Sequence, residues 1–349
     1  TTATQGLIVD ADERVDGRQQ HLHISLDHKI GHWAHHAALT QSQNSTDYLV
    51  NGTAASGLRG ERLLLDLQTA RRINSGRAER SINMGIQSEQ RNFENIYAGL
   101  SAANYTADDS QNSLFAEYLV DYARTSLALS LRRDWNQRFA NATTARGSVS
   151  HVLLSSAASQ SRLHLSFGQG ITNPSFFELF GFIPSTFIGN PDLKPEQSTS
   201  FDFGWSQSGE SELAGSQTQW DFDLTYFSAD LQNEIATVYD ANFMSQPINL
   251  ETDSDRSGIE VSGNLVIGTT WQLAIAYTRL TAEENGVEEV RRPKHSGQVR
   301  LSRDFADSKG RASIQFLHNG RRTDNEFIYA TEATRANLQP YTLTNVGIS

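Results

Sequence analysis

Apolar and polar residues alternate along most of this 349-residue chain. Leu163, Leu165 and Phe167, for example, occupy every second position, with polar residues or glycine between them. The same pattern recurs at 22–26, 82–86, 127–131, 201–205, 220–226, 259–267 and 271–277. Because successive side chains of a β-strand point to opposite faces, this period of two predicts strands with one apolar face and one polar face.

The strands are long, which distinguishes between kinds of β-protein. Many alternating segments run for about ten residues, whereas strands of soluble proteins usually have about five or six. Ten residues that rise about 3.3 Å each and tilt by about 40° span roughly 25 Å, the height of the apolar band of an outer-membrane barrel. The sequence therefore predicts an all-β fold, a transmembrane antiparallel barrel wall of about fifteen strands.

The connections between strands alternate between short and long, as periplasmic turns and external loops do in such barrels. The sequence predicts short turns near Gly31, 74–76, Ala123, 155–161, 208–216, 268–270 and 307–310. It predicts long loops at 44–60, 89–112, 135–144, 172–196, 229–255, 283–293 and 320–340. The first strand is placed near 20–29 and the last near 341–349.

Individual residues can be assigned to a face on this basis. We expect the apolar side chains Phe222, Leu224, Leu273 and Ile275 to face lipid. The carboxylates that alternate with such residues, among them Asp221, Asp223 and Glu260, are expected to face a hydrated lumen. The tryptophans Trp33, Trp205, Trp220 and Trp271 are expected beside short turns, and Trp135 at the opposite end. Such positions are typical of membrane-interface aromatic girdles, although tryptophans at strand ends also pack under loops in other β-proteins.

Composition excludes several other classes. The chain has no cysteine, which excludes a disulfide scaffold and metal–thiolate sites. Its formal net charge of -11 argues against broad nucleic-acid binding, and we expect no nucleic-acid partner. The chain also lacks a phosphate-binding loop and the common hydrolase motifs, so we predict that it is not an enzyme and has no catalytic residues.

One segment is not explained by strand rhythm alone. It contains Asn173-Pro174, then Glu178-Leu179, and then a run in which Gly189, Asn190, Pro191, Leu193, Pro195 and Glu196 stand at fixed spacing. This order resembles the barrel signature of the TonB-dependent outer-membrane receptors. Two further segments, at 257–260 and 291–295, are similar to strand starts of the same family. Within it, the segment 179–191 is most similar to the cobalamin-receptor branch.

The resemblance implies an architecture and a function. Family members have a plug domain and a 22-stranded barrel, so the chain, taken as a single domain over 1–349, would hold about fifteen of those strands and no plug. It implies a location in the bacterial outer membrane, in contact with outer-membrane lipid. The implied function is TonB-energised uptake of a scarce large nutrient, a cobalamin or a ferric siderophore, with TonB acting through the plug. Two alternatives from other classes are a passive porin-like channel or adhesin barrel and a soluble secreted β-protein such as a lectin.

Aromatic and cationic residues in the predicted loops are candidates for substrate contacts. Aromatic rings and guanidinium groups together suit a large ligand that has both apolar and anionic surfaces. The candidate residues are Phe182, Phe187, Tyr239, Arg321, Arg322 and Tyr329. For Phe176 and Phe177 the favoured interpretation is instead that they pack the family motif against the barrel wall.

Metal binding has two candidate segments. Asp10, Asp12 and Asp16 precede the first predicted strand, and carboxylates at this density suit Ca²⁺. Calcium also occurs in external loops of the cobalamin branch, but a solvated acidic loop is the favoured interpretation, and no other cofactor is expected. His21 and His23 share one strand face and could hold a metal, although a hydrated lumen wall or a periplasmic rim is the favoured interpretation.

Overall fold

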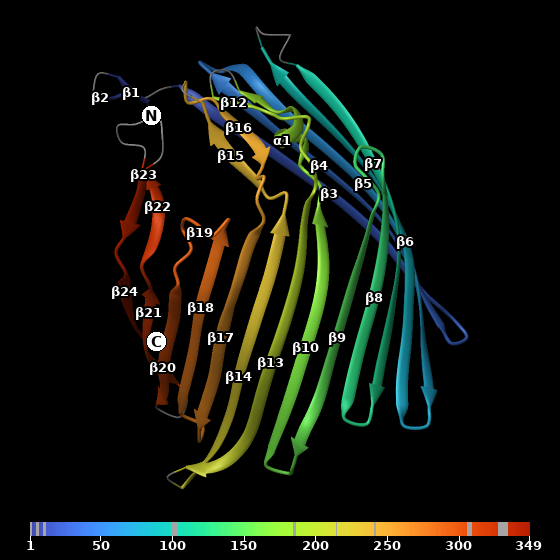
Figure 1. Cartoon of the computed structure of the whole chain (residues 1–349), viewed down its shortest axis with the longest axis vertical. Helices are drawn as coiled ribbons and strands as arrows, with labels where there is room; N and C mark the ends of the chain where they lie inside the picture. The colour runs from blue at the N-terminus through green and yellow to red at the C-terminus, as the bar shows by residue number, and fades with distance from the viewer. Residues whose placement is uncertain are drawn as a thin grey trace.

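The computed structural model describes residues 2–4, 7–9, 12–98, 104–183, 186–213, 215–240, 242–305, 309–326 and 334–349. Its main feature is a curved antiparallel wall (Figure 1). Fifteen strands follow one path from β24 to β3, each beside its neighbour in the chain, and the short β19 pairs with β18 off this path. The predicted fold class and the predicted strand number are confirmed.

The wall strands run 8 to 23 residues. They are β3 (Glu13–Ile30), β4 (Trp33–Val50), β5 (Thr53–Ser75), β6 (Ala78–Tyr97), β7 (Tyr105–Tyr122), β8 (Thr125–Asn136), β9 (Ala142–Ser155), β10 (Ser159–Thr172), β13 (Glu196–Leu213), β14 (Ser216–Gln232), β17 (Ser254–Ile267), β18 (Trp271–Glu284), β20 (His295–Phe305), β21 (Gly310–Asn319) and β24 (Tyr341–Ile348).

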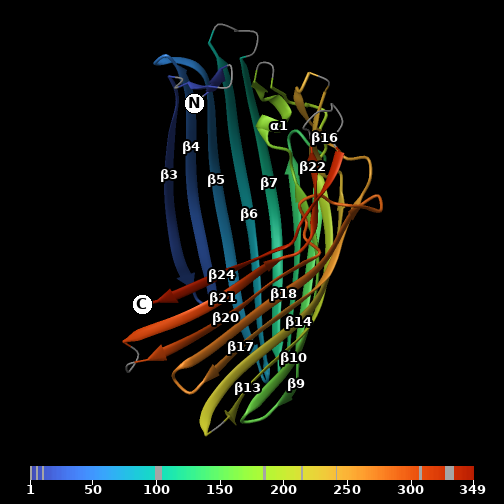
Figure 2. The ribbon, with the colours of Figure 1, turned by 90° about the vertical axis from the view of Figure 1, so that its left-hand side faces the viewer.

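The smaller elements lie at one end of the wall, which we call the loop end; the opposite end is the turn end (Figures 1 and 2). They include a five-residue helix, α1 (Phe176–Phe180), the pairs β11 (Phe182–Ile183) and β12 (Phe187–Ile188), and β15 (Ile235–Tyr239) and β16 (Ser245–Asn249). The others are β1 (Thr2–Thr4), β2 (Leu7–Val9), β19 (Val287–Glu288), β22 (Arg322–Glu326) and β23 (Thr334–Leu338). In the described residues, no helix is long and apolar enough to cross a membrane.

Strand register places the apolar side chains on one face of the wall. Leu224 lies beside Trp205 on one side and Val261 on the other, and Ile275 lies beside Gly263 and Val299. Large side chains on this face are widely exposed, for example Leu131 at 56% and Val346 at 72%. Such a face is soluble only in an apolar solvent, which is the environment a membrane provides.

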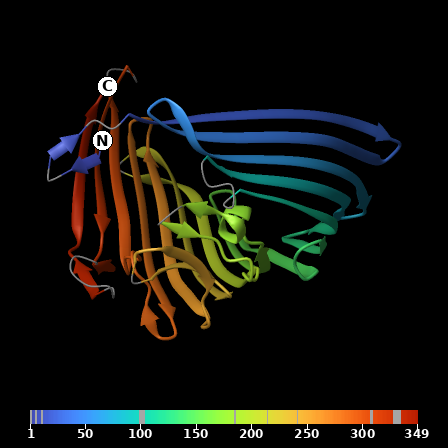
Figure 3. The same cartoon turned by 90° about the horizontal axis from the view of Figure 1, so that it is seen from above.

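The polar side chains share the opposite, concave face. Figure 3 shows α1 inside the curve of the wall. Phe176 of α1 stacks on Phe93 of β6, so Phe93 points to the concave face. Arg91 stands two residues from Phe93 on the same strand and therefore points to the same face. The paired residues of successive strands point to the same face, and following these pairs across the wall places Asp221, Asp223 and Glu260 on the concave face. The predicted inward and outward assignments are therefore confirmed.

The turn end matches the predicted short connections near Gly31, 74–76, Ala123, 155–161 and 268–270, whereas 208–213 belong to β13 and 307–308 lie outside the described residues. Gly31, Gly76 and Gly268 have positive φ values of 59°, 61° and 57°, which glycine adopts at little cost in tight turns. Trp205 differs from prediction, because β13 continues to Leu213 and leaves it at mid-strand. Its indole N–H donates to Ser161 Oγ at 2.8 Å, near the start of β10.

Two predicted long loops are wrong. Residues 44–60 form a continuous hairpin with a two-residue turn between β4 and β5, and 89–112 is largely occupied by β6 and β7. Near the loop end both faces of these strands carry polar residues. The alternation of apolar and polar residues therefore disappears, although the backbone hydrogen bonds between the strands continue. The first strand likewise begins at Glu13, so Asp16 lies within β3, paired with Asp47, and not in a loop before it.

Candidate functional site

The motif segment leaves the wall at the end of β10 and crosses its concave face. Asn173 Nδ2 donates to Gln111 Oε1 at 3.4 Å and to Asn136 Oδ1 at 3.3 Å, which joins this segment to β7 and β8. Ser175 and Glu178 then form a capping box, with the Ser175 N–H donating to Glu178 Oε2 at 2.7 Å. The motif residues Asn173 and Glu178 therefore start and orient α1.

Aromatic stacking fixes α1 against the wall. Phe176 stacks on Phe93 with ring centroids 5.7 Å apart, and Phe180 stacks on Tyr105 at 4.6 Å. Leu179, on the same helix, is buried. For Phe176 the predicted packing against the wall is confirmed. Phe177 instead stacks on Phe187 of β12 at 4.6 Å, so it holds a neighbouring loop strand.

The second half of the motif binds the loop between β14 and β17. Asn190 Nδ2 donates to the Pro247 carbonyl at 3.0 Å. Asn249 accepts from the Lys194 N–H at 2.8 Å and donates to the Lys194 carbonyl at 2.9 Å. A parallel contact between β12 and β16 adds to these bonds, and together they form what we call the loop clasp.

Two further motif residues support the loop clasp. The Glu196 carboxylate accepts from the Ile235 N–H at 2.8 Å, where β13 and β15 begin. Gly189 passes so close to α1 that a Cβ there would lie 2.7 Å from the Leu179 carbonyl carbon. The strand begins at Glu196, after the irregular stretch that holds Pro191 and Pro195, as expected because proline donates no ladder hydrogen bond.

Gly189→Ala should loosen the loop clasp, because the new methyl group must displace the backbone of α1. Overpacking of this kind costs about 1–3 kcal/mol. Hydrogen exchange read by mass spectrometry should show amides of 179–190 and 235–249 exchanging roughly tenfold faster. Gly17→Ala is the matched control, because a Cβ there meets no atom within 4 Å. Unchanged exchange in Gly189→Ala would contradict a close-packed clasp.

The predicted substrate residues are divided between two places. Phe182, Phe187 and Tyr239 lie on one four-stranded loop sheet made of β11, β12, β16 and β15. Arg321 and Arg322 precede or begin a separate hairpin, and Arg322 lies over the Tyr341 ring at 5.7 Å. Tyr329 lies outside the described residues.

The loop sheet exposes several apolar side chains, of which Tyr239 was among the predicted substrate contacts. Tyr239 is 56% exposed and Phe243, in the connection between β15 and β16, is 59% exposed. Ile183 is exposed on the same face of the loop sheet as Tyr239, whereas Ile188 and Val238 are exposed on its other face. Short alternating segments inside a loop were the available signal, and exposed apolar side chains grouped in this way commonly mark a binding surface.

Ion pairs join the remaining loops to one another. Arg256 contacts Glu234 at 2.7 Å and Glu289 at 2.8 Å, linking the β14–β17 and β18–β20 loops. Arg291 Nε donates to Asp324 Oδ1 at 2.8 Å, which reaches the β22 hairpin. The hydrogen bond from Arg291, helped by the Asn325 N–H, holds the pKa of the Asp324 carboxyl below its usual range.

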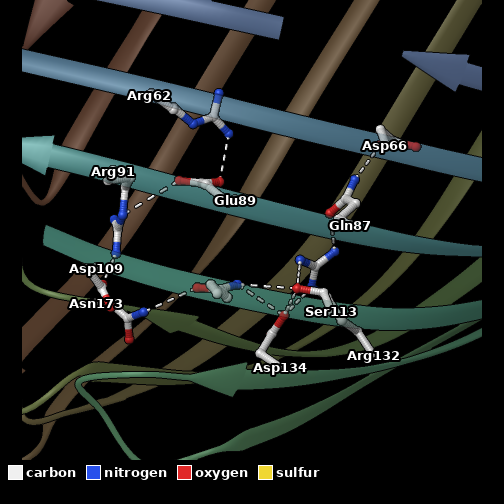
Figure 4. A network of polar contacts seen from close by, with 11 residues as sticks. Arg62, Asp66, Gln87, Glu89, Arg91, Asp109, Ser113, Arg132, Asp134 and Asn173 are labelled. Atoms are coloured by element: carbon white, nitrogen blue, oxygen red, sulfur yellow. Dashed lines mark hydrogen bonds and ion pairs between the residues drawn. The ribbon is translucent and has the colours of Figure 1, made fainter. Parts of the chain in front are cut away.

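A charged network covers the concave wall below α1 (Figure 4). Arg62 contacts Glu89 at 2.8 Å, and Arg91 contacts Asp109 at 2.5 Å. The second part of the network centres on Asp134 and Arg132, which contact each other at 2.8 Å. Among the residues drawn in this network, all of which the structure describes, three buried acceptor oxygens have no hydrogen-bond partner: Asp66 Oδ1, Asp109 Oδ1 and Asn173 Oδ1. These three oxygens are also shielded from solvent, so hydrogen bonds do not fully satisfy the network.

The metal candidates are not brought together. His21 and His23 contact Ser42 at 3.0 Å and Thr40 at 2.9 Å. Asp16 is paired with Arg14 at 2.6 Å, and Asp10 lies outside the described residues. Within the described part of the chain, no three His, Asp or Glu side chains are grouped to hold a metal. Calcium binding by Asp10, Asp12 and Asp16 stays a prediction.

Comparison with known proteins gives one family. A family model described as "TonB dependent receptor-like, beta-barrel" matches residues 3–349. Over 258 residues the chain is 23% identical to the vitamin B12 transporter BtuB of Photobacterium profundum, covering 71% of this chain and 38% of that protein.

Solved structures share the fold at low identity. The siderophore receptor PirA from Acinetobacter baumannii has a TM-score of 0.74 at 14% identity, covering 95% of this chain and 56% of that one. A mutant of the ferric enterobactin receptor PfeA from Pseudomonas aeruginosa, in complex with enterobactin, has a TM-score of 0.74 at 15% identity, covering 95% and 54%. This chain thus spans little more than half the length of these solved relatives.

Proposed function

Since this chain belongs to the TonB-dependent receptor family, whose barrels lie in the outer membrane of Gram-negative bacteria, we propose that it forms the wall and external loops of a receptor for TonB-energised nutrient uptake. The observation that carries the proposal is the family match over residues 3–349. The loop end is then extracellular and the turn end periplasmic. Family members are receptors and transporters and not enzymes. The match favours this function over a passive channel, an adhesin or a lectin.

The substrate we propose is a cobalamin, with a ferric siderophore as the second candidate. The match to a vitamin B12 transporter supports the first, and the fold shared with siderophore receptors is compatible with the second. The exposed apolar side chains of the loop sheet favour a ligand with extensive apolar surface, because Ile183, Tyr239 and Phe243 carry no charge. Arg321, Arg322 and Tyr329 remain proposed contacts on a second loop.

In this proposal the loop clasp gives the substrate a rigid platform. Ordering flexible loops on binding costs affinity, so loops that are already held together bind more tightly. TonB acts through a plug domain that is not part of these 349 residues. The charged lumenal wall lies along the path that a substrate follows from the loop sheet inward.

Binding of cyanocobalamin to the full-length receptor tests the substrate. Tyr239→Ala combined with Phe243→Ala should weaken binding roughly tenfold or more, about 1.4 kcal/mol, because two exposed aromatic anchors are lost. Tyr122→Ala is the control, because Tyr122 is also 56% exposed but lies at the turn end. Equilibrium binding of labelled ligand gives the dissociation constants.

Two outcomes separate the parts of the proposal. Binding of a ferric catecholate chelate without binding of cyanocobalamin would replace the substrate and leave the receptor function intact. Uptake by whole cells should be lost when TonB is deleted, and equal uptake with and without TonB would contradict the energised mechanism.

A further inference from the structure

The ladder between β9 and β10 stops before either strand ends. Its last pair at the extracellular side is Arg146 with Gly168. Beyond it, β9 is paired only with β8 and β10 only with β13. If the ladder continued, Thr144 would face Gly170. Instead 142–145 and 169–172 border an opening, which we call the seam, and backbone groups on both edges face it.

A polar groove lies at the seam on the outward face of the wall. Its cavity has a volume of about 290 Å³ and contacts both seam edges. This is close to the lower end of the range for small-molecule sites, about 300 Å³, which suits a ligand of one ring. Among the residues that line the groove, the strand pairing shows which side chains point outward. They are Gln169, Gln197 and Thr199, with Thr143, Asp230 and Gln232 around them.

The chemistry of this groove suits a neutral ligand rich in hydroxyl groups. Glutamine amides and threonine hydroxyls offer both donors and acceptors, as sugar hydroxyls do. None of the residues that line the groove is basic, but the Arg133 guanidinium donates to Thr143 Oγ1 at 2.7 Å and places one positive charge at the groove edge. Asp230 lies beside Asp255, which in turn lies beside Glu283, so a row of carboxylates borders the groove. These three carboxylates outnumber Arg133, so the net charge around the groove is negative and disfavours a phosphate group.

The depth of the groove indicates where its ligand comes from. Phe167 and Phe201 are outward-facing and 41% and 38% exposed, and they belong to the lipid-facing band. Gln169 and Thr199 each stand two residues further toward the extracellular end, about 7 Å along the strand. The groove therefore opens at the level of lipid headgroups in the outer leaflet.

We propose that the groove at the β9–β10 seam binds a sugar unit of an outer-leaflet glycolipid. Gln169 and Gln197 hold the sugar hydroxyls, and the acyl chains lie on the apolar band below. Because the lipid is anchored beside the groove, a weak sugar contact is strengthened by high effective concentration. The site is separate from the loop sheet and does not depend on which nutrient is taken up.

Native mass spectrometry of the full-length receptor in detergent tests this site. The probes are a monogalactosyl diacylglycerol, a phosphatidylglycerol with the same acyl chains, and free methyl β-galactoside. We expect the galactosyl lipid to be retained, and Gln169→Ala with Gln197→Ala to weaken its binding roughly tenfold or more. Phosphatidylglycerol should bind roughly tenfold more weakly. Excess methyl galactoside should displace the galactosyl lipid, because the sugar is the part recognised.

The matched control is Gln90→Ala, which removes another outward-facing exposed glutamine, on β6, away from the seam. It should leave lipid binding unchanged. If the double variant does not fold, Thr199→Val removes one groove hydroxyl while keeping the side-chain shape and should also weaken binding. The proposal is overturned by full lipid retention in the groove variants, by equal loss in Gln90→Ala, by equally tight phosphatidylglycerol binding, or by failure of the free sugar to compete.

Discussion

Ile275→Arg is expected to destabilise the complete barrel by roughly 2–4 kcal/mol, the cost of a cation near the bilayer midplane. Ile275 is outward-facing and 39% exposed, and it is the fifth residue of β18, near the middle of the apolar band. Leu273 is a poorer test, because it lies only two residues from Trp271 at the periplasmic end of the strand. Reversible unfolding from lipid vesicles in urea measures the change.

Two neighbouring variants show whether lipid surrounds this residue. Ile275→Ala should cost much less than the arginine variant, because lipid chains fill the space that the side chain leaves. Ala276→Arg points into the lumen between Ser262 and Gln298, where water reaches the guanidinium, and should also cost little. In a packed protein core, Ile→Ala would itself cost about 2–5 kcal/mol. If Ile275→Ala is as damaging as Ile275→Arg, the lipid-facing assignment is wrong.

Asp134→Ala is expected to cost roughly 3 kcal/mol, the lower end of the range for breaking a buried ion pair. Asp134 is 4% exposed, and its Oδ1 accepts from Ser113 Oγ at 2.6 Å, Arg132 Nε at 2.8 Å and Gln111 Nε2 at 3.1 Å. Its removal leaves these donors without an acceptor in the partly enclosed wall. The lower end applies because the Arg132 side chain remains 34% exposed to water.

A double-mutant cycle separates the ion pair from simple loss of packing. Arg132→Leu combined with Asp134→Leu should cost clearly less than the sum of the two single changes, because no unpaired charge remains. The same urea unfolding in vesicles provides all four free energies of unfolding. Strict additivity would mean that Arg132 and Asp134 do not stabilise each other, although Figure 4 shows them in direct contact.

The sequence by itself determined the strands that cross the membrane and the faces of their side chains. The direction of a side chain depends only on its position along its own strand, so alternation is a local property. The turn end was predictable for a similar reason, because Gly31 and Gly76 adopt positive φ values that few other residues tolerate. The family motif was visible because its prolines and glycines stand at fixed spacing.

Only the tertiary structure decided what the motif and the loops contact. Asn190 reaches the Pro247 carbonyl and Gln111 accepts from Asn173, across 57 and 62 residues of sequence, and no local pattern records such a pairing. The external hairpin at 44–60 was missed because both of its faces are wet, so the backbone ladder holds it without any hydropathy signal. The seam between β9 and β10 could not be predicted either, because apolar and polar residues alternate normally in each strand. Whether two neighbouring strands stay paired depends on the positions of the chain segments that precede and follow them.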